Sequence, residues 1–222
     1  MCGRFALDIP RKRLEEHFDA ELPDLPSRYN IAPGQDILAV VGEAGRRVGR
    51  MFRWGLVPFW AKDAKIGYKL INARVESAAD KPAFRGAFAR RRCIIPAGGF
   101  YEWRRVGREA RPYFYSLAGG EPMGLAGLWE SWRPAEGDPL RTCTILTCPA
   151  NALVAEVHER MPVVLRPDDY GAWLEPGPPG PELAASVALP HRPEDFTVQR
   201  VSPRVNAPGP DDPDLLKPWP GE

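Results

Sequence analysis

Hydrophobic and polar residues alternate or cluster in short runs along most of the chain, a pattern that predicts many short strands and few helices. Strand-length runs bounded by turn residues predict strands at 37–41, 48–54, 93–95, 100–104, 113–117, 125–129, 142–147, 163–165 and 196–201. Helical spacing predicts helices at 10–18, 76–91, 151–157 and 167–174, with Pro82 interrupting the second and Asn151 capping the third. This arrangement favours an α+β fold built on antiparallel sheet.

The chain has 222 residues and shows neither an internal repeat nor a composition shift that would divide it. The Pro/Gly-rich segment 175–181 is predicted to be a surface loop rather than a domain boundary. After Pro203 the sequence is again rich in proline, and we expect this end to be loosely held. The sequence therefore predicts one domain over residues 1–206 and a proline-rich tail over residues 207–222.

Composition excludes several classes of protein. The net charge is only +1, so attraction to a polyanion would have to come from a local patch. No apolar run has the length of a membrane span or a signal peptide, which predicts a cytoplasmic protein with reduced thiols. With three histidines and no CxxC pair we expect no metal site. We expect Cys93, Cys143 and Cys148 to be small buried hydrophobic residues.

Cys2 follows the initiator methionine directly, and removal of Met1 would leave an amine and a thiol on neighbouring carbons. The α-amine has a pKa of about 7.7–8.0, so a useful fraction is neutral at physiological pH. The thiol titrates at about 8.5, and nearby cations would lower its pKa. Such a 1,2-aminothiol forms an imine with an aldehyde and then closes to a thiazolidine ring. The alternative interpretation is an incidental residue at a frayed chain end.

Three further side chains are candidates for acid–base or positioning roles. Asn72 precedes a predicted helix, and its amide could cap that helix or hold the N-terminal amine or a sugar hydroxyl. Glu102 lies between aromatic residues, where burial would raise its pKa toward neutrality, although it could instead face water. Histidine is the residue type best suited to general acid–base catalysis near neutrality, but His158 could merely complement a helix dipole.

Arginine and aromatic residues gather in the middle of the sequence. Seven arginines and one acidic residue lie between positions 85 and 108. Aromatic residues that could stack on bases are Trp54, Trp60, Phe100, Tyr101 and Trp103. Cations for phosphates and flat faces for bases are what a single-stranded nucleic acid requires. The alternative is a solvated basic helix face beside an aromatic core, which we favour for residues 90–92.

Seven short motifs occur in a fixed order along the chain. They are MCGRF at 1–5, YNIAP at 29–33, WGLVP at 54–58, NARVE at 72–76, CIIPAGGFYEW at 93–103, HERMP at 158–162 and VSPRVN at 201–206. In this combination the chain resembles the SOS-response-associated peptidase (SRAP) family. The resemblance covers residues 1 to about 206. The acidic segment 211–214 and the spacer at 175 look specific to this chain.

The resemblance implies a single domain in which antiparallel strands form a barrel-like core with peripheral helices. It also implies that Cys2, Asn72, Glu102 and His158 converge on one pocket and need no cofactor or metal. Cys2 would crosslink, as a thiazolidine, to the ring-opened sugar of an abasic site in single-stranded DNA. By the same resemblance Arg74 and Arg160 would grip phosphates. The cleft for DNA would be shaped by Arg4, Asn30 and Trp54.

Other activities stay open at the level of the sequence. Cys2, His158 and Asn72 resemble the Cys-His-Asn set of a cysteine peptidase, and removal of Met1 is itself peptide hydrolysis. An N-terminal-nucleophile amidohydrolase can also begin Met-Cys-Gly. A non-catalytic module could bind single-stranded DNA through arginine and aromatic residues alone. Slow closure of the thiazolidine ring would allow some β-elimination, which is a lyase activity. We expect the protein to be a monomer.

Overall fold

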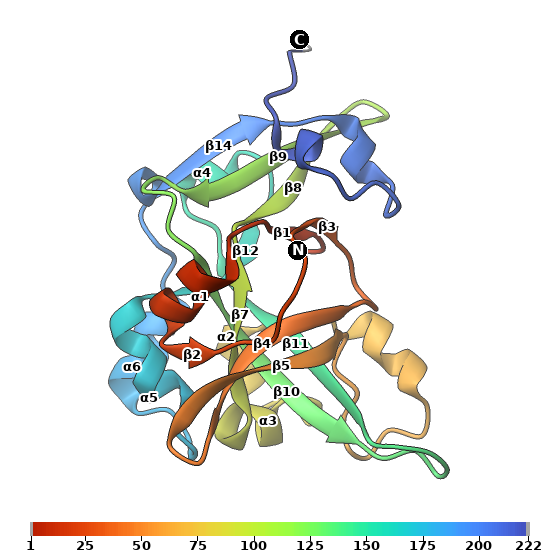
Figure 1. Cartoon of the computed structure of the whole chain (residues 1–222), viewed down its shortest axis with the longest axis vertical. Coiled ribbons are helices and arrows are strands. Elements are labelled where there is room, and N and C mark those ends of the chain that lie inside the picture. Colours follow the sequence, from red (N-terminus) through yellow and green to blue (C-terminus); the bar gives the residue numbers. More distant parts are fainter. Residues whose placement is uncertain (1, 221–222) are drawn as a thin grey trace.

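The computed structural model describes residues 2–220, and two β-sheets, one above the other in Figure 1, form its framework. The upper sheet has the strand order β14-β9-β8-β1-β3. Its strands are β14 (Phe196–Arg200), β9 (Glu109–Leu117), β8 (Gly99–Val106), β1 (Phe5–Leu7) and β3 (Arg28–Ile31). All pairs in this sheet are antiparallel.

The lower sheet curls into a closed barrel. Its main path is β12 (Arg160–Pro162), β11 (Leu140–Pro149), β10 (Met123–Trp132), β7 (Arg92–Ala97), β4 (Asp36–Glu43), β5 (Arg46–Trp54) and β2 (Ala20–Glu21). Strand β13 (Val164–Leu165) pairs with β10, and β6 (Asn72–Arg74) pairs with β11. A further pairing of β11 with β5 joins the ends of a five-stranded ring. The α+β fold with a barrel core is thereby confirmed, although the pair that closes the barrel is parallel.

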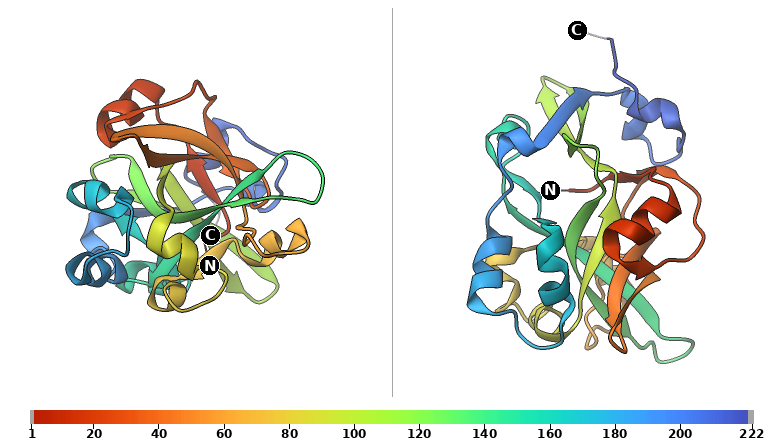
Figure 2. Two further views of the ribbon diagram at one scale, coloured as in Figure 1. Left: turned by 90° about the horizontal axis from the view of Figure 1, so that it is seen from below. Right: turned by 60° about the vertical axis from the view of Figure 1, so that its left-hand side comes forward.

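Short helices surround the barrel (Figures 1 and 2). They are α1 (Arg11–Phe18), α2 (Val75–Ala78), α3 (Arg85–Arg90), α4 (Ala152–Ala155), α5 (Tyr170–Leu174) and α6 (Pro181–Ala188). Single 3₁₀ turns occur at Ala64–Lys69, Pro167–Asp169, Pro193–Asp195, Pro203–Asn206 and Pro213–Leu216. Pro82 separates α2 from α3 as predicted, and Asn151 Oδ1 accepts the predicted capping bond from the Val154 N–H at 3.0 Å. Helix α6 was not predicted, because the segment before it reads only as a Pro/Gly loop.

The main core fills the barrel and the space between the two sheets. All six residues of β7 are buried, which explains why its sequence after Arg92 is a continuous apolar run rather than an alternating one. The four cysteines are buried free thiols, as predicted for Cys93, Cys143 and Cys148. A second, smaller core lies on the other face of the upper sheet and consists of Ala6, Tyr101, Phe114, Val201, Val205 and Leu215.

The C-terminal segment packs firmly against that second core, so the prediction of a loosely held end is wrong up to residue 220. Leu215 is completely buried. The Asp211 carboxylate accepts hydrogen bonds from the backbone N–H groups of Tyr29 (2.5 Å) and Asn30 (2.9 Å) and pairs with Arg28 at 2.8 Å. Proline-rich composition suggested mobility, but these specific contacts hold the segment. The limit at residue 206 stays a prediction of the sequence, and packing continues across it.

Candidate active site

Cys2 lies in the interior of the molecule, between the two sheets, and Figure 2 shows the start of the chain entering this region. Its side chain has no exposed surface and belongs to the main core. Strand β1 follows it and pairs with β8 in the register Phe5↔Phe100, which directs the start of the chain toward Glu102. The alternative of a frayed end is therefore wrong.

The Cys2 thiol is held in its neutral form. Burial raises its pKa far above the ordinary value, and the negative charge of Glu102 raises it further. A hydrogen bond with the backbone of Arg4 acts in the opposite direction but is weaker. Nearby positive charge does lower this pKa, as expected, but burial outweighs that effect and the net direction is upward. The sulfur becomes a nucleophile only when a base removes its proton.

Asn72 connects the barrel to the start of the chain. It begins β6, which runs parallel to β11 with Asn72 opposite Ile145. Its Nδ2 donates a hydrogen bond to the Cys2 carbonyl oxygen at 2.8 Å. Helix α2 has Arg74 at its N-cap and no side-chain cap, so the capping interpretation of Asn72 is wrong. The Asn72 Oδ1 is buried without a hydrogen-bond partner among residues 2–220, and a buried acceptor of this kind is suited to a bound donor.

Glu102 is placed by β8, whose close approach to β9 depends on a glycine. A Cβ at Gly99 would collide with the Phe114 ring and the Tyr115 carbonyl oxygen, so only glycine fits there. Three residues along the strand, Glu102 is 3% exposed. Burial raises the pKa of its carboxyl group, whereas the positive charge of a nearby His158 acts to lower it. Glu102 can therefore hold or release a proton closer to neutrality than an exposed glutamate can.

His158 follows helix α4, and its backbone N–H still bonds to the Val154 carbonyl at 2.9 Å. The ring turns toward the backbone of Arg160, whose N–H lies 3.0 Å from Nδ1. When Nδ1 accepts that bond, the proton of the neutral ring is on Nε2. Glu102 is the neighbour that links the other two groups, because its charge acts on the Cys2 thiol and the charge of His158 acts on Glu102.

The two predicted phosphate-binding arginines have different surroundings. Arg74 ends β6 and is exposed. Arg160 is 9% exposed, and its two terminal nitrogens bind the Glu76 carboxylate at 2.6 and 2.9 Å. The second nitrogen also reaches the Thr147 carbonyl at 2.5 Å. A phosphate at Arg160 would have to compete with Glu76, a residue to which the sequence analysis gave no role.

Arg4, Asn30 and Trp54 make internal contacts. Arg4 Nη1 donates to Asn30 Oδ1 at 2.6 Å and to the Val205 carbonyl at 2.8 Å. Asn30 and Trp54 are each 1% exposed, and the Trp54 indole N–H is bonded to the Ile71 carbonyl at 2.8 Å. In this structure Asn30 and Trp54 offer almost no surface of their own, whereas Arg4 is half-buried. Their predicted part in shaping a cleft stays a prediction.

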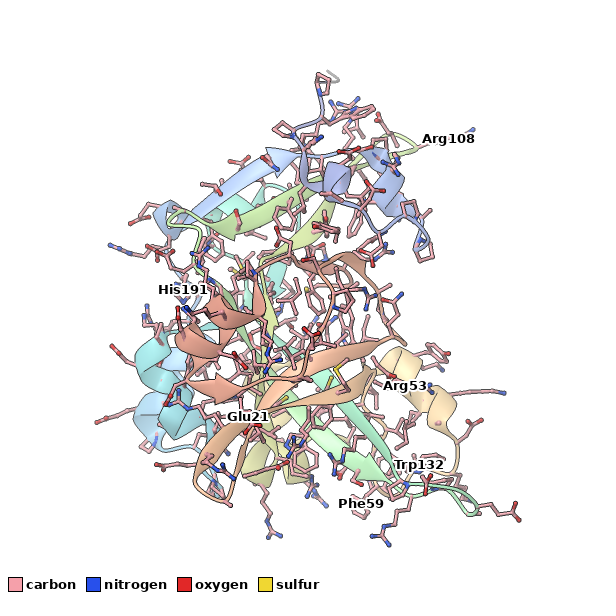
Figure 3. The ribbon with its side chains drawn as sticks, in the orientation of Figure 1. Glu21, Arg53, Phe59, Arg108, Trp132 and His191 are labelled. Atoms are coloured by element: carbon pink, nitrogen blue, oxygen red, sulfur yellow. The ribbon has the colours of Figure 1, made fainter. Side chains whose placement is uncertain are left out.

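The aromatic residues divide into buried and exposed side chains. Phe100 and Tyr101 are completely buried and offer no surface for a base, which corrects their predicted stacking role. Trp60 is 49% exposed and follows Phe59, which is 67% exposed. Figure 3 shows Phe59 and Trp132 toward the lower end of the molecule, where the Trp132 indole N–H donates to the Ala61 carbonyl at 2.7 Å. Stacking surfaces therefore exist, but at fewer positions than the sequence suggested.

No group of three or more potential ligand residues in the described part of the chain could hold a metal ion. Within residues 2–220 no helix is long and apolar enough to cross a membrane. The arrangement at Cys2 thus consists of a thiol, a carboxyl group of raised pKa, an imidazole and an amide. These groups are suited to proton transfer around a nucleophile.

A β-barrel with its chain start buried beside such groups defines a class of protein. The sequence model of the family described as SOS response associated peptidase (SRAP) matches residues 1–208, and the chain belongs to this family.

Several relatives are similar over most of their length. "Abasic site processing protein YoqW" of Bacillus subtilis (strain 168) is 42% identical over 224 residues, which cover 98% of this chain and 99% of that protein. "Abasic site processing protein YedK" of Escherichia coli (strain K12) is 32% identical over 201 residues, covering 86% and 88%. A crystal structure of a protein from Bacteroides thetaiotaomicron matches with a TM-score of 0.88 and 22% identity, covering 98% of this chain and 100% of that one. At this identity the last match shows the fold alone.

Proposed function

We propose that this protein processes abasic sites in single-stranded DNA by forming a covalent thiazolidine between Cys2 and the ring-opened sugar. The observation that carries the proposal is the convergence of Cys2 with Asn72 and Glu102 in one buried place. The names of the relatives, each an abasic site processing protein, support the same class of substrate. Exposed Arg74 and the exposed aromatic residues are suited to a single strand.

The first step is exposure of the Cys2 amine by removal of Met1, which lies outside the described residues. Cys2 with Glu102 and His158 could carry out this hydrolysis on the chain itself. We limit the proposed peptidase activity to the protein's own first residue.

The covalent chemistry then proceeds with balanced proton transfers. Glu102 or His158 protonates the ring oxygen of the sugar while a base takes the proton of the C1′ hydroxyl, and the ring opens to the aldehyde. The Cys2 amine adds to C1′, and Glu102 supplies the proton with which water leaves to give the imine. The thiol sulfur adds to the same carbon while its proton passes through a base to the nitrogen. The sum is one aldehyde plus one aminothiol giving one thiazolidine and one water.

The raised pKa of the thiol gives Glu102 a second task. The negative charge of Glu102 disfavours the thiolate form of Cys2, so the thiol keeps its proton until a base removes it. Ring closure then depends on transfer of the thiol proton to a neighbouring base. If closure is slow, the imine acidifies the neighbouring sugar carbon and some strand cleavage by β-elimination follows. No step requires a cofactor or a metal ion.

Substitution of Cys2 tests the proposal. We expect Cys2→Ala to abolish the stable crosslink to an oligonucleotide with one abasic site on a denaturing gel. Cys2→Ser keeps the amine but cannot close the sulfur ring, so it should give a product only when borohydride traps the imine. Equal amounts of stable product from Cys2→Ala and wild type would refute the mechanism.

The same material separates the other candidate functions. A non-covalent DNA-binding module would bind the oligonucleotide in a salt-dependent way without any shifted band. A cysteine peptidase would turn over an added peptide, and an amidohydrolase would hydrolyse glutamine, with or without DNA. The monomeric state, a cytoplasmic location with action at the nucleoid, and a link to the SOS response accompany the proposal and stay predictions.

A further inference from the structure

Strand β8 continues beyond Glu102 into a basic hairpin that the chemistry at Cys2 does not use. Side chains two apart on a strand share a face, so Arg104 lies on the face of β8 that carries Glu102. The register of β8 and β9 places Arg104 opposite Arg111, and β9 with β14 places Arg200 opposite Tyr113. We call Arg104, Arg111 and Arg200 the arginine ladder.

The ladder lies on the same face of the upper sheet as the active site. Glu102 is opposite Tyr113 and Phe100 is opposite Tyr115, and the latter pair belongs to the main core that contains Cys2. The alternate residues Tyr101 and Phe114 belong to the second core, beneath the C-terminal segment. Arg104 is thus about 7 Å beyond Glu102 along the strand, on the side where the sugar would be held.

The opposed pair of Arg104 and Arg111 carries an excess of positive charge among the described residues. Like charges directly opposite one another on paired strands are destabilising. Glu109 pairs with Arg111 at 2.8 Å, and it also lies 3.7 Å from Arg200. Arg104 is exposed, and no carboxylate of residues 2–220 lies within ion-pair distance of it. An opposed arginine pair with this excess of charge is suited to an anion that lies across both strands.

We propose that the arginine ladder binds backbone phosphates on one side of the lesion and so directs the DNA strand along the β8–β9 hairpin. This inference rests on the proposed function. A guanidinium group can bind a phosphate through two parallel N–H···O hydrogen bonds, which fixes the direction of the contact as well as adding affinity. Because the net charge of the whole protein is only +1, a local surface of this kind is needed to attract DNA. The hairpin extends outward, and Figure 3 shows Arg108 at its tip.

The test is the double variant Arg104→Gln with Arg111→Gln. Binding is measured by fluorescence anisotropy on a single strand that contains a tetrahydrofuran abasic analogue, which cannot react. We expect the Kd at 0.1 M salt to rise about tenfold. The slope of log K against log salt should become shallower by about 1.4, or about 0.7 for each phosphate that the protein no longer neutralises. The analogue is placed near one end of the oligonucleotide and then near the other, so that most of the strand extends to one side of the lesion or to the other side. The double variant should bind more weakly than wild type in only one of these two arrangements.

The matched control removes two arginines elsewhere. Arg105 is exposed on the opposite face of β8, and Arg46 is exposed at the β4–β5 turn. Arg46→Gln with Arg105→Gln changes the net charge equally, and we expect wild-type crosslinking and a salt slope within about 0.3 of wild type. If the control weakens binding as much as the ladder variant does, or both strand placements are weakened equally, the ladder is not the binding surface.

Two further measurements keep the outcomes distinct. Thermal unfolding should show the ladder variant no less stable than wild type, because substitution relieves the repulsion between opposed arginines. If it does unfold early, Arg104→Gln alone, which has no ion pair to lose, should still reduce the slope by about 0.7. Should wild type form no crosslink with true abasic DNA while the ladder still controls binding, the proposed chemistry fails and the ladder stands. Unchanged binding by a folded ladder variant overturns the ladder alone.

Discussion

The two faces of the upper sheet use the same strands in different ways. On the face toward the barrel, β8 presents Glu102 with a raised pKa, close to Cys2 and to an Asn72 oxygen that lacks a partner in the described structure. On the opposite face, beneath the C-terminal segment, the polar side-chain atoms of Asn30 have hydrogen-bond partners within the protein. Its Oδ1 accepts from Arg4, and its Nδ2 donates to the carbonyls of Ala207 and Pro210 at 2.9 and 2.6 Å.

This difference shows how one sheet can serve chemistry and stability at once. Buried polar groups that are satisfied by the protein stabilise a fixed structure, whereas groups left unsatisfied or forced into an unfavourable charge state are available to a ligand. The polar groups of the barrel-side face are available to a ligand, whereas those of the segment-side face stabilise the fixed structure. Substitution of polar groups on the barrel-side face should therefore change reaction rates with little loss of stability, and substitutions on the segment-side face should do the reverse.

The largest effect is expected for Glu102→Gln, which removes the proposed proton donor. The rate of crosslinking to abasic DNA should fall about 10²- to 10⁴-fold, as measured from single-turnover time courses. The matched control is Glu16→Gln, since Glu16 lies on α1 with its side chain 67% exposed, and it should react at the wild-type rate. A Glu102→Gln protein that crosslinks normally would remove Glu102 from the mechanism.

The same variant gives a pH-dependent stability with a defined sign. Above the ordinary glutamate pKa of about 4.3, the unfolded chain loses a proton that folded wild type retains because the pKa of Glu102 is raised. Wild-type stability therefore decreases as pH rises through that window, and glutamine avoids the loss. Urea unfolding should find the variant at least as stable as wild type at pH 7, with no such advantage below about pH 4.

The next effect is expected on the opposite face, at Leu215. Leu215→Ala removes a completely buried side chain and should lower the free energy of unfolding by about 2–4 kcal/mol. The melting temperature should fall by roughly 4–16 °C, while folded protein at 20 °C still crosslinks DNA. Leu189→Ala is the control, because Leu189 is 67% exposed and should melt like wild type. A melting temperature unchanged by Leu215→Ala would mean that the segment contributes no stability.

The smallest effect is expected for Asp211→Asn. This substitution removes the negative charge of the carboxylate that accepts hydrogen bonds from the backbone N–H groups of Tyr29 and Asn30. Unfolding free energy should fall by about 1–2 kcal/mol. The neighbouring Asp212 pairs with Arg204 at the surface at 2.7 Å, and Asp212→Asn should cost less than about 1 kcal/mol. Equal losses from the two variants in urea titrations would contradict the distinction between a built-in contact and a surface pair.

Periodicity predicted the elements best where one physical cause acts alone. Pro82 interrupts a helix because it lacks the N–H that the helix needs, and Asn151 caps one because its side chain replaces a missing acceptor. The failures occurred where distant partners decide. Strands β1 and β3 are short, and their sequences show no period that separates them from loops.

The candidate site was predicted by motif order, and its details were not. Cys2, Asn72, Glu102 and His158 were named from their chemistry and the resemblance, yet the direction of the Cys2 thiol pKa was missed because burial cannot be read at a chain end. Glu76 was missed as the partner of Arg160 because the two are 84 residues apart in the sequence. Their pairing depends on the position of β12 beside β11.

The sequence by itself determined the family, the alternation of strands and the choice of Cys2 as the proposed nucleophile, since these depend on residue identity and local spacing. Tertiary structure alone decided which groups are buried together, because desolvation and pairing arise only when distant segments meet. It raised the pKa values of Cys2 and Glu102, fixed the C-terminal segment against the upper sheet and placed the arginine ladder on the face that carries the candidate site. A one-residue shift in the pairing of β8 would move Glu102 to the other face and separate it from Cys2.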